Sequence, residues 1–404
     1  MIGVSAVVWG LGLAVGGASE VKVQPYGVVW TNFFYNVGSV NNIDIPFLST
    51  ASTGSDTFGA TARQTRVGLK ASIPKVWGGA TIKGHFESDF FAGSANSAFQ
   101  ASKPIPRIRI ASIALEWERA RVLVGQDWTI FAPLNPASLA HASIPGFAAT
   151  GNLWDRAPQI RFEWWRGSGA LKYGVQAALY APVDNELFSG ATVADQTYAV
   201  FRSADPIGLS RLPGGQARLW FGLDMPSGKQ GVLGIASHTH FERYFFEGGA
   251  ETLLQASGVA VDVALPVTKW LSLSGEFFFG KNLESFMGGA MQGVKKTTAA
   301  ASDGSGKTVL TSTREIGTMG GWAQLSLAPT SVWSFHFGYG IDQPNEDDIA
   351  TKTRSRNTAG YVGIGITPHE KLKFAVEYNW LETQSKGATI QTGHHFNLGA
   401  SLDF

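Results

Sequence analysis

Apolar and polar residues alternate along many short segments of this chain, and this pattern restricts the possible folds more than any other feature. The final segment, residues 391–404, places an apolar side chain at every second position from Phe396 to the terminal Phe404. Successive side chains of a β-strand point to opposite faces, so the segment predicts a strand with one apolar and one polar face. Such a strand suits a soluble sandwich, or a barrel whose outer face contacts lipid.

About sixteen segments share this pattern, an even number such as bacterial outer-membrane barrels contain. They cover residues 22–35, 61–71, 79–91, 105–117, 119–127, 156–166, 170–181, 215–224, 231–243, 254–265, 269–281, 313–327, 332–342, 354–366, 371–382 and 391–404. The sequence therefore predicts an all-β fold, a single transmembrane antiparallel β-barrel of about sixteen strands.

The predicted connections alternate between short and long. Residues 118–120 and 266–268 are typical of the short ones. The long ones are residues 36–60, 92–104, 128–155, 182–214 and 282–312. Short turns at one end of a barrel and long loops at the other explain this asymmetry, whereas such loops are uncommon in compact soluble domains. We expect residues 128–155 to fold inward as a constriction loop, within one barrel domain of residues 19–404.

Composition supports a membrane barrel and excludes several other classes. Charged residues make up 16% of the chain, which is below the roughly 25% of soluble domains. A mean hydropathy near zero is too polar for a helical bundle in a bilayer but suits strands that are apolar on one face. The net charge of +1 gives no reason to expect a nucleic-acid partner. The absence of cysteine excludes disulfides and thiol sites.

The N-terminal residues are typical of a secretory signal. An apolar, glycine-rich run covers residues 2–15 and is followed by Gly16, Gly17 and Ala18. We expect residues 1–18 to be a signal peptide that is cleaved after Ala18, although no basic residues precede the apolar run. The run is too short for a spanning helix, which needs about 20 residues. An exported chain with barrel-type strands is expected in a Gram-negative type outer membrane.

Most charged residues fall in the phase opposite the apolar ones, which directs them into the lumen. A charge on the lipid face near the bilayer centre would cost about 2–4 kcal/mol. Ile108 and Ile110 are expected to face lipid, with the phase of that strand lost near Ile113. The predicted pore-lining and selectivity residues are Arg66, Lys70, Lys83, Glu87, Asp89, Arg107, Arg109, Arg161, Glu163 and Arg218.

Two interpretations of these arginines are open. The guanidinium group is permanently charged and its fork of donors matches a carboxylate. A ring of arginines in a narrow aqueous pore therefore raises the local concentration of anions. Alternatively, the arginines pair with Glu87, Asp89 and Glu163 across strands and support the wall. The two interpretations can hold together.

The sequence predicts no catalytic, cofactor or metal site. His238 and His240 lie on one strand face and could share a metal, but no acidic partner stands at a fixed spacing. A barrel enzyme would need a nucleophile and a histidine in a recognisable arrangement, and none stands out, so no enzymatic activity is expected. A surface receptor or adhesin that acts through the long extracellular loops is the alternative function.

Three stretches resemble the DcaP-like outer-membrane porins. They are Thr61–Lys70, Phe86–Phe91 and Val122–Phe131, which resemble an Arg-rich strand, a GDFF-type strand and a GQ-x-W-x-x-F segment that leads into the pore loop. The second stretch reads Glu-Ser-Asp-Phe-Phe in place of Gly-Asp-Phe-Phe. The resemblance covers residues 61–165. It implies a trimeric, sixteen-stranded porin whose pore favours small anionic solutes such as dicarboxylates.

These observations predict a passive diffusion channel with a modest anion preference and no cofactor. Its expected partners are outer-membrane lipid, two further copies of the chain in a homotrimer formed through apolar strand faces, and small anionic solutes in transit. The terminal Phe404 also resembles the C-terminal signal by which outer-membrane barrels reach their assembly machinery.

Overall fold

The computed structural model describes residues 20–51, 56–93, 95, 97–181, 210–246, 249–302 and 308–404. The predicted signal peptide, residues 1–18, lies outside the described residues. No helix among the described residues is long and apolar enough to cross a membrane.

Strands dominate the described chain. They are β1 (Lys22–Val37), β2 (Thr57–Thr61), β3 (Arg66–Ile73), β4 (Thr81–Asp89), β5 (Arg107–Glu116), β6 (Ala120–Trp128), β7 (Arg156–Ser168), β8 (Leu171–Tyr180), β9 (Gly214–Asp224), β10 (Gln230–Phe245), β11 (Glu251–Leu265), β12 (Leu271–Lys281), β13 (Val294–Ala300), β14 (Thr308–Glu315), β15 (Gly317–Leu327), β16 (Trp333–Pro344), β17 (Arg354–His369), β18 (Leu372–Ser385) and β19 (Gln391–Asp403). Short helical turns are η1 (Trp77–Gly79), α1 (Ala98–Ala101), η4 (Glu284–Phe286) and α4 (Gly288–Met291).

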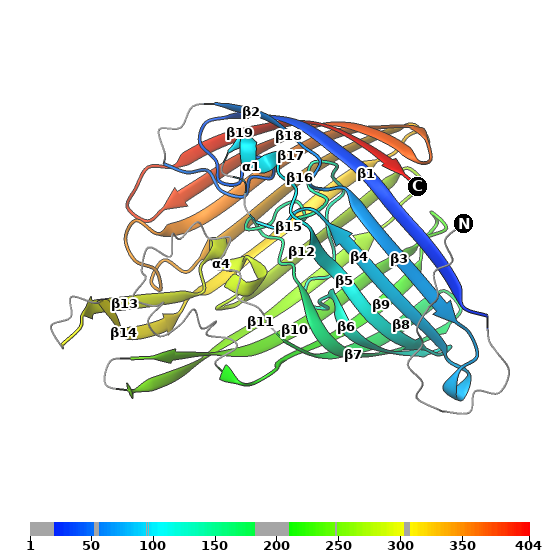
Figure 1. Cartoon of the computed structure of the whole chain (residues 1–404), viewed down its shortest axis with the longest axis horizontal. Coiled ribbons are helices and arrows are strands. Elements are labelled where there is room, and N and C mark those ends of the chain that lie inside the picture. Colours follow the sequence, from blue (N-terminus) through cyan, green and yellow to red (C-terminus); the bar gives the residue numbers. More distant parts are fainter. Residues whose placement is uncertain are drawn as a thin grey trace, which may run out of the picture.

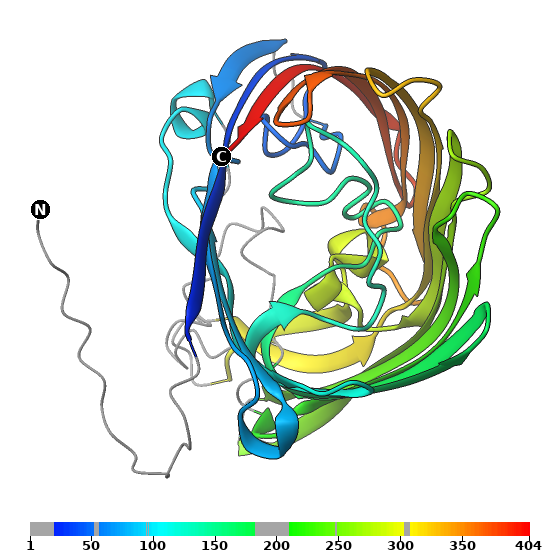
Figure 2. The same ribbon diagram turned by 90° about the vertical axis from the view of Figure 1, so that its right-hand side faces the viewer.

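Antiparallel pairing closes the main sheet into a barrel, as Figures 1 and 2 show from the side and from one end. Closure occurs where β1 pairs with β19, from Val28 opposite Asp403 to Val37 opposite His394. Both β2 and β3 pair with β1 and share one position in the wall, so seventeen strands fill sixteen positions. The predicted fold class is confirmed, and each predicted segment contains one wall strand.

Alternation along the strands separates an apolar outer face from a polar inner face. On β12, Phe277 and Phe279 are 52% and 55% exposed, whereas the intervening Phe278 is 1% exposed. On β18, Val376 is exposed and the adjacent Glu377 is buried. Exposed aromatic and aliphatic side chains on one face are what lipid contact requires. The same period therefore fixes both the outer surface and the lumen.

Besides the β1–β2 connection, whose Phe47 carbonyl accepts from Asn357 of β17 at 2.8 Å, two long connections fold into the barrel. The constriction loop, residues 128–155, lies inside the ring of strands as predicted. A second inward segment, residues 282–293, was not predicted; it carries η4 and α4. The rest of that long connection forms a two-stranded hairpin, β13–β14, rather than an irregular loop. The predicted strand 313–327 is interrupted at Ile316, where β14 ends and β15 begins.

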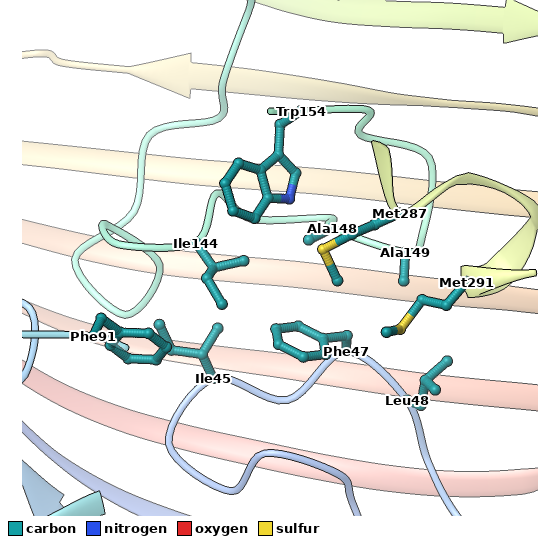
Figure 3. Close-up of a cluster of buried hydrophobic side chains, with 10 residues drawn as sticks. All are labelled: Ile45, Phe47, Leu48, Phe91, Ile144, Ala148, Ala149, Trp154, Met287 and Met291. Carbon is teal, nitrogen blue, oxygen red and sulfur yellow. The ribbon is translucent and has the colours of Figure 1, made fainter. Parts of the chain in front are cut away.

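Part of the lumen is apolar, which differs from the expected uniformly polar interior. Four connections meet in one cluster, shown in Figure 3. Its side chains are Ile45, Phe47, Leu48, Phe91, Ile144, Ala148, Ala149, Trp154, Met287 and Met291. Loops of this length reach one another across the barrel and bury their own apolar residues, because that removes apolar surface from water.

Candidate pore constriction

The constriction loop begins where β6 separates from β5. The two strands pair from Arg121 to Gln126, while β6 stays paired with β7 as far as Trp128. Gly125 permits the bend: its φ is 126°, and a Cβ there would lie 2.3 Å from the Ala111 oxygen. The Gln126 Nε2 then donates to the free carbonyls of residues 108 and 109 at 2.9 and 3.2 Å. The Gly-Gln pair therefore opens the wall without leaving these carbonyls unpaired.

A β-bulge in β5 directs two arginines inward. Glu87 lies opposite Ile110 and Ser88 lies opposite Ile108, so Arg109 is the extra residue. Arg107 and Arg109 both reach carboxylates of β4 from this arrangement. Ile110 is 6% exposed, so its predicted lipid-facing position was wrong. The phase shifts at Arg109 rather than near Ile113, because the extra residue resets the alternation.

Buried ion pairs join β4 to β5. Arg107 contacts Asp89 in a two-point arrangement, with N–O distances of 2.8 and 3.0 Å. Arg109 donates to Glu87 at 2.6 Å and to the second Asp89 oxygen at 2.9 Å. Charge-assisted bonds of this length are among the strongest in proteins. These pairs match the interpretation in which arginines brace the wall.

The turn of the constriction loop presents its backbone to the same arginines. The Ser143 carbonyl accepts from Arg107 and Arg109 at 2.8 and 3.2 Å, and from Arg156 at 3.4 Å. Arg66 donates to the neighbouring Ala142 carbonyl. A carbonyl oxygen has two lone pairs, so three guanidinium donors exceed its normal capacity. The loop is therefore held against the wall by the Ser143 carbonyl oxygen, which accepts from more donors than it has lone pairs.

We call this group the arginine cluster: Arg66, Arg107, Arg109 and Arg156, with Glu87 and Asp89. It contains four guanidinium groups and two carboxylates, so positive charge is in excess. Arg66 and Arg156 form no ion pair with any described residue. Their guanidinium carbons lie 5.8 Å from the Trp30 ring and 4.7 Å from the Trp128 ring. Cation–π contact offsets only part of the cost of burying an unpaired charge.

The opposite wall holds the loop through a single carboxylate of β18. Glu377 is 3% exposed and accepts three hydrogen bonds from consecutive loop residues. The donors are the Ser138 hydroxyl at 2.7 Å and the backbone N–H groups of Leu139 and Ala140 at 2.6 and 2.8 Å. Its charge is therefore compensated by loop dipoles rather than by a cation.

Three further side chains bind the loop backbone at successive positions along the loop. Glu276 on β12 accepts from the Leu134 N–H at 2.7 Å. Gln324 on β15 both accepts from and donates to Ala137, at 2.8 and 3.0 Å. Gln64 accepts at 2.7 and 2.9 Å from the N–H groups of the two loop residues whose carbonyls meet the arginines. The loop is therefore pinned along most of its outward course.

Other predicted residues lie outside the arginine cluster. Arg161 pairs with Glu163 at 2.7 Å and donates to a carbonyl at the start of the constriction loop. Arg218 makes a two-point pair with Asp262 at 2.8 and 2.6 Å. Lys83 pairs with Glu116 at 2.7 Å and is about half exposed. Lys70 stands over the Tyr26 ring, 5.0 Å from its centroid.

The sequence did not predict Arg156 as a member of the cluster, because the strand alternation places its side chain on the wrong face. Period two places it on the same face as the exposed Pro158, which would be the lipid face. Beyond Gln126, however, β6 and the start of β7 leave the wall, and this face turns toward Arg109. The bend at Gly125 was the available signal. Glu377 and Gln324 were missed because their loop partners are distant in sequence.

Two titratable groups of the constriction loop are desolvated. Burial lowers the pKa of His141 to about 4, so this imidazole is neutral at pH 7. Burial raises the pKa of Asp155 to about 7, although its own neighbour Arg156 acts in the opposite direction. Asp155 therefore changes charge near neutral pH, directly beside the arginine cluster.

The histidine pair considered for metal binding is buried on β10. His238 Nε2 lies 3.0 Å from His240 Nδ1, and His240 Nε2 lies 3.3 Å from a Glu242 oxygen. These atoms bond to one another in a row along the strand. Among the described residues, no group of three or more His, Cys, Asp or Glu is arranged to hold a metal ion.

No family model matches the chain, and no curated protein matches it either. Solved structures do share its fold. The outer membrane channel DcaP of Acinetobacter baumannii is 16% identical with a TM-score of 0.68, over 96% of this chain and 100% of that chain. The anion-selective porin from Comamonas acidovorans is 14% identical with a TM-score of 0.54, over 95% and 100%. OmpT of Vibrio cholerae, in a trimer form, is 10% identical with a TM-score of 0.55, over 95% and 99%.

At these identities the likeness establishes the fold. The expected resemblance to the DcaP channel is confirmed at that level, over nearly the whole length of both chains. The likeness therefore extends well beyond residues 61–165, the part in which the sequence resemblance was seen.

Proposed function

We propose that this chain is a porin of the DcaP-like type, a passive outer-membrane channel for small hydrophilic solutes with a preference for organic anions. The observation that carries the proposal is the arginine cluster, in which four guanidinium groups face two carboxylates beside the constriction loop. An aqueous path lined by excess positive charge concentrates anions and repels cations. Solutes move down their gradients, and no bond is made or broken.

Dicarboxylates are the solute class that we propose first. Their two carboxylates match the pair of excess charges in the cluster, and a guanidinium binds a carboxylate through two parallel bonds. The carboxylates of the opposite wall do not cancel this preference, because Glu377 and Glu276 are already bonded to loop N–H groups. The similarity to an anion-selective porin is in keeping with this proposal.

The test is electrical. Purified protein is inserted into a planar bilayer, and the reversal potential is measured in a potassium chloride gradient and then with succinate, acetate and a neutral sugar. We expect large conductance steps and a reversal potential displaced toward that of the anion. A clear cation preference would refute the proposed selectivity, and the absence of conductance would refute the channel and favour the receptor or adhesin alternative.

Assembly and location complete the proposal. We propose that residues 1–18 are removed on export, that the terminal Phe404 is read by the barrel assembly machinery, and that the mature barrel forms homotrimers through apolar strand faces. The exposed aromatic and aliphatic residues of the outer face support contact with lipid and with neighbouring copies. Mass measurement of the detergent-solubilised protein tests the trimer directly.

A further inference from the structure

Some guanidinium N–H groups of the arginine cluster have no hydrogen-bond acceptor in the described part of the chain, and support of the barrel wall alone does not explain them. Arg66 Nε and Arg156 Nη1 are buried atoms with no hydrogen-bond partner among the described residues. Buried polar groups are almost always bonded, so each of these atoms calls for an explanation. Both belong to residues that meet at the turn of the constriction loop.

The groups that do contact Arg66 and Arg156 are poor counterparts for a cation. Their hydrogen-bond acceptors are the carbonyl oxygens of Ala142 and Ser143, which carry partial charge as dipoles and no net charge. The other contacts are with tryptophan rings, which are also uncharged. The Ser143 oxygen is shared among three guanidinium groups. Bonds from a guanidinium to an anionic oxygen are roughly twice as strong as those to a neutral one.

Gln64 aims one of these carbonyls, that of Ala142, at the arginines. Its amide oxygen accepts from the N–H groups of residues 142 and 143, and its amide nitrogen donates to the Ala140 carbonyl at 3.0 Å and to Asn32 at 2.8 Å. The Ser143 N–H and the Ala142 carbonyl belong to the same trans peptide group, so the bond from this N–H to Gln64 turns the Ala142 carbonyl toward the arginines. Gln64 thus acts as a positioning residue for the loop turn.

We propose that the arginine cluster is a saturable binding site for one small oxyanion, and that the carbonyls of Ala142 and Ser143 occupy it in the free protein. An incoming carboxylate, phosphate or sulfate takes the donors of Arg66 and Arg156, and the loop turn moves away from the wall. This inference rests on the proposed function and adds to it a discrete site and a loop that yields to the bound anion.

Charge balance favours a ligand with two negative charges. The cluster has two guanidinium groups beyond its carboxylates, so a divalent anion neutralises it and a monovalent anion neutralises half. Chloride lacks the several oxygens that could meet separate guanidinium groups, and it is expected to pass without displacing the loop. Sulfate therefore serves as the probe, acetate as the monovalent oxyanion, and chloride as the carrier of current.

The first experiment titrates sulfate against chloride current at constant ionic strength in a planar bilayer. We expect saturable reduction of chloride current by sulfate, and about tenfold weaker reduction by acetate. Arg66→Gln and Arg156→Gln should each weaken the sulfate effect about tenfold, because each removes one charge-assisted contact. Arg243→Gln is the matched control, since Arg243 pairs with Glu251 in an exposed hairpin.

Gln64→Leu separates loop displacement from simple charge attraction. Without Gln64 the Ala142 carbonyl is no longer aimed at Arg66, so it competes less and sulfate should bind more tightly than in the unaltered protein. A merely structural role for Gln64 would leave the sulfate midpoint unchanged or weaken it, and that result would overturn the displacement.

Hydrogen–deuterium exchange gives a readout that does not depend on conduction. Sulfate should speed exchange in a peptide covering residues 138–146 and leave a peptide of β18 unchanged. A channel that prefers chloride to potassium but shows neither saturation nor faster exchange with sulfate would refute this inference and leave the proposed function intact. A barrel without conductance, whose loop exchange still responds to sulfate, would refute the channel and keep the site.

Discussion

The two sides of the lumen use charge in opposite ways. On the side of β3–β7, four guanidinium groups meet two carboxylates, and two of the four have only neutral carbonyl oxygens as hydrogen-bond acceptors within the described ranges. On the side of β12 and β18, Glu276 and Glu377 are buried without a cation and are bonded to loop N–H groups. The first side contains guanidinium groups without an anionic partner among the described residues, whereas the carboxylates of the second side accept hydrogen bonds from the protein's own backbone.

This difference is how a chain with a net charge of +1 would build the anion-selective lumen that we propose. Acidic and basic residues are nearly equal in number, but what matters in a pore is which charges remain uncompensated. A carboxylate that accepts three hydrogen bonds from a loop holds that loop firmly, and burial keeps Glu377 out of contact with a passing ion. In the proposed channel, loop anchoring and solute selection lie on opposite walls.

The largest effect is expected from the double variant Arg66→Gln with Arg156→Gln. It removes both excess charges while leaving the ion pairs of Arg107 and Arg109 in place, so the anion-to-cation permeability ratio should fall several-fold. The reversal potential in a salt gradient measures this ratio. The double variant Arg109→Ala with Arg161→Ala should widen the passage and also weaken the preference, but less, because only Arg109 belongs to the cluster and Glu163 keeps Arg121 as a partner. Equal effects in the two double variants would contradict the division into paired and excess arginines.

Glu377→Gln is expected to have the next largest effect. The amide keeps one acceptor oxygen and loses the charge, which weakens three bonds to the loop at a cost of about 2 kcal/mol or more in loop docking. Single-channel recordings should show higher conductance and more current noise, with little change in the permeability ratio. Glu382→Gln is the control on the same strand, since Glu382 pairs with Arg356. A change in selectivity without added noise would mean that Glu377 acts on solutes and not on the loop.

Gly125→Ala tests the bend at which β6 separates from β5 and the constriction loop begins. A methyl group there would meet the Ala111 oxygen at 2.3 Å, and the positive φ disfavours any side chain. We expect about 1–3 kcal/mol of lost stability, measured by denaturant unfolding in lipid vesicles. Gly84→Ala is the control in the same region, because its Cβ would lie an ordinary 3.7 Å from the Ala71 side chain. Equal losses in the two variants would show that the bend is not strained.

The wall of this barrel was predictable from sequence because lipid imposes a strict period of two on every strand. Phe396 to Phe404 and the sister segments upstream gave the strands, the number of wall positions and the exposed face. The rule fails where the wall is interrupted. In β5, Arg109 is an extra residue that shifts the alternation by one position, so Ile110 is buried. Beyond Gln126, β6 no longer pairs with β5, and Arg156, which the alternation places on the lipid face, points toward the arginine cluster.

The loop anchors were beyond sequence reasoning for a different reason. Glu377 binds residues 138–140, which lie more than two hundred positions earlier in the chain, and the N–H groups that it accepts are common to all residues but proline. Backbone partners leave no trace in composition or spacing. The inward segment 282–293 was missed because its apolar residues follow no strand period. Phe286 packs against wall side chains such as Tyr180 and Phe278, and Met287 and Met291 pack against other connections.

The smallest effect is expected from Asp155→Asn, and it depends on pH. Burial raises the pKa of Asp155 to about 7, so the carboxyl is mostly neutral at pH 6 and mostly charged at pH 8. Its negative charge beside Arg156 offsets part of the excess on the arginine wall, so the anion preference of the unaltered protein should decline slightly as the pH rises through 7. The asparagine variant should match the unaltered protein at pH 6 and exceed its anion preference at pH 8. The measurement is the reversal potential of both proteins at pH 6 and at pH 8. If the variant differs from the unaltered protein equally at the two pH values, Asp155 is charged at both. The excess positive charge of the arginine cluster would then be one charge smaller than its contacts suggest.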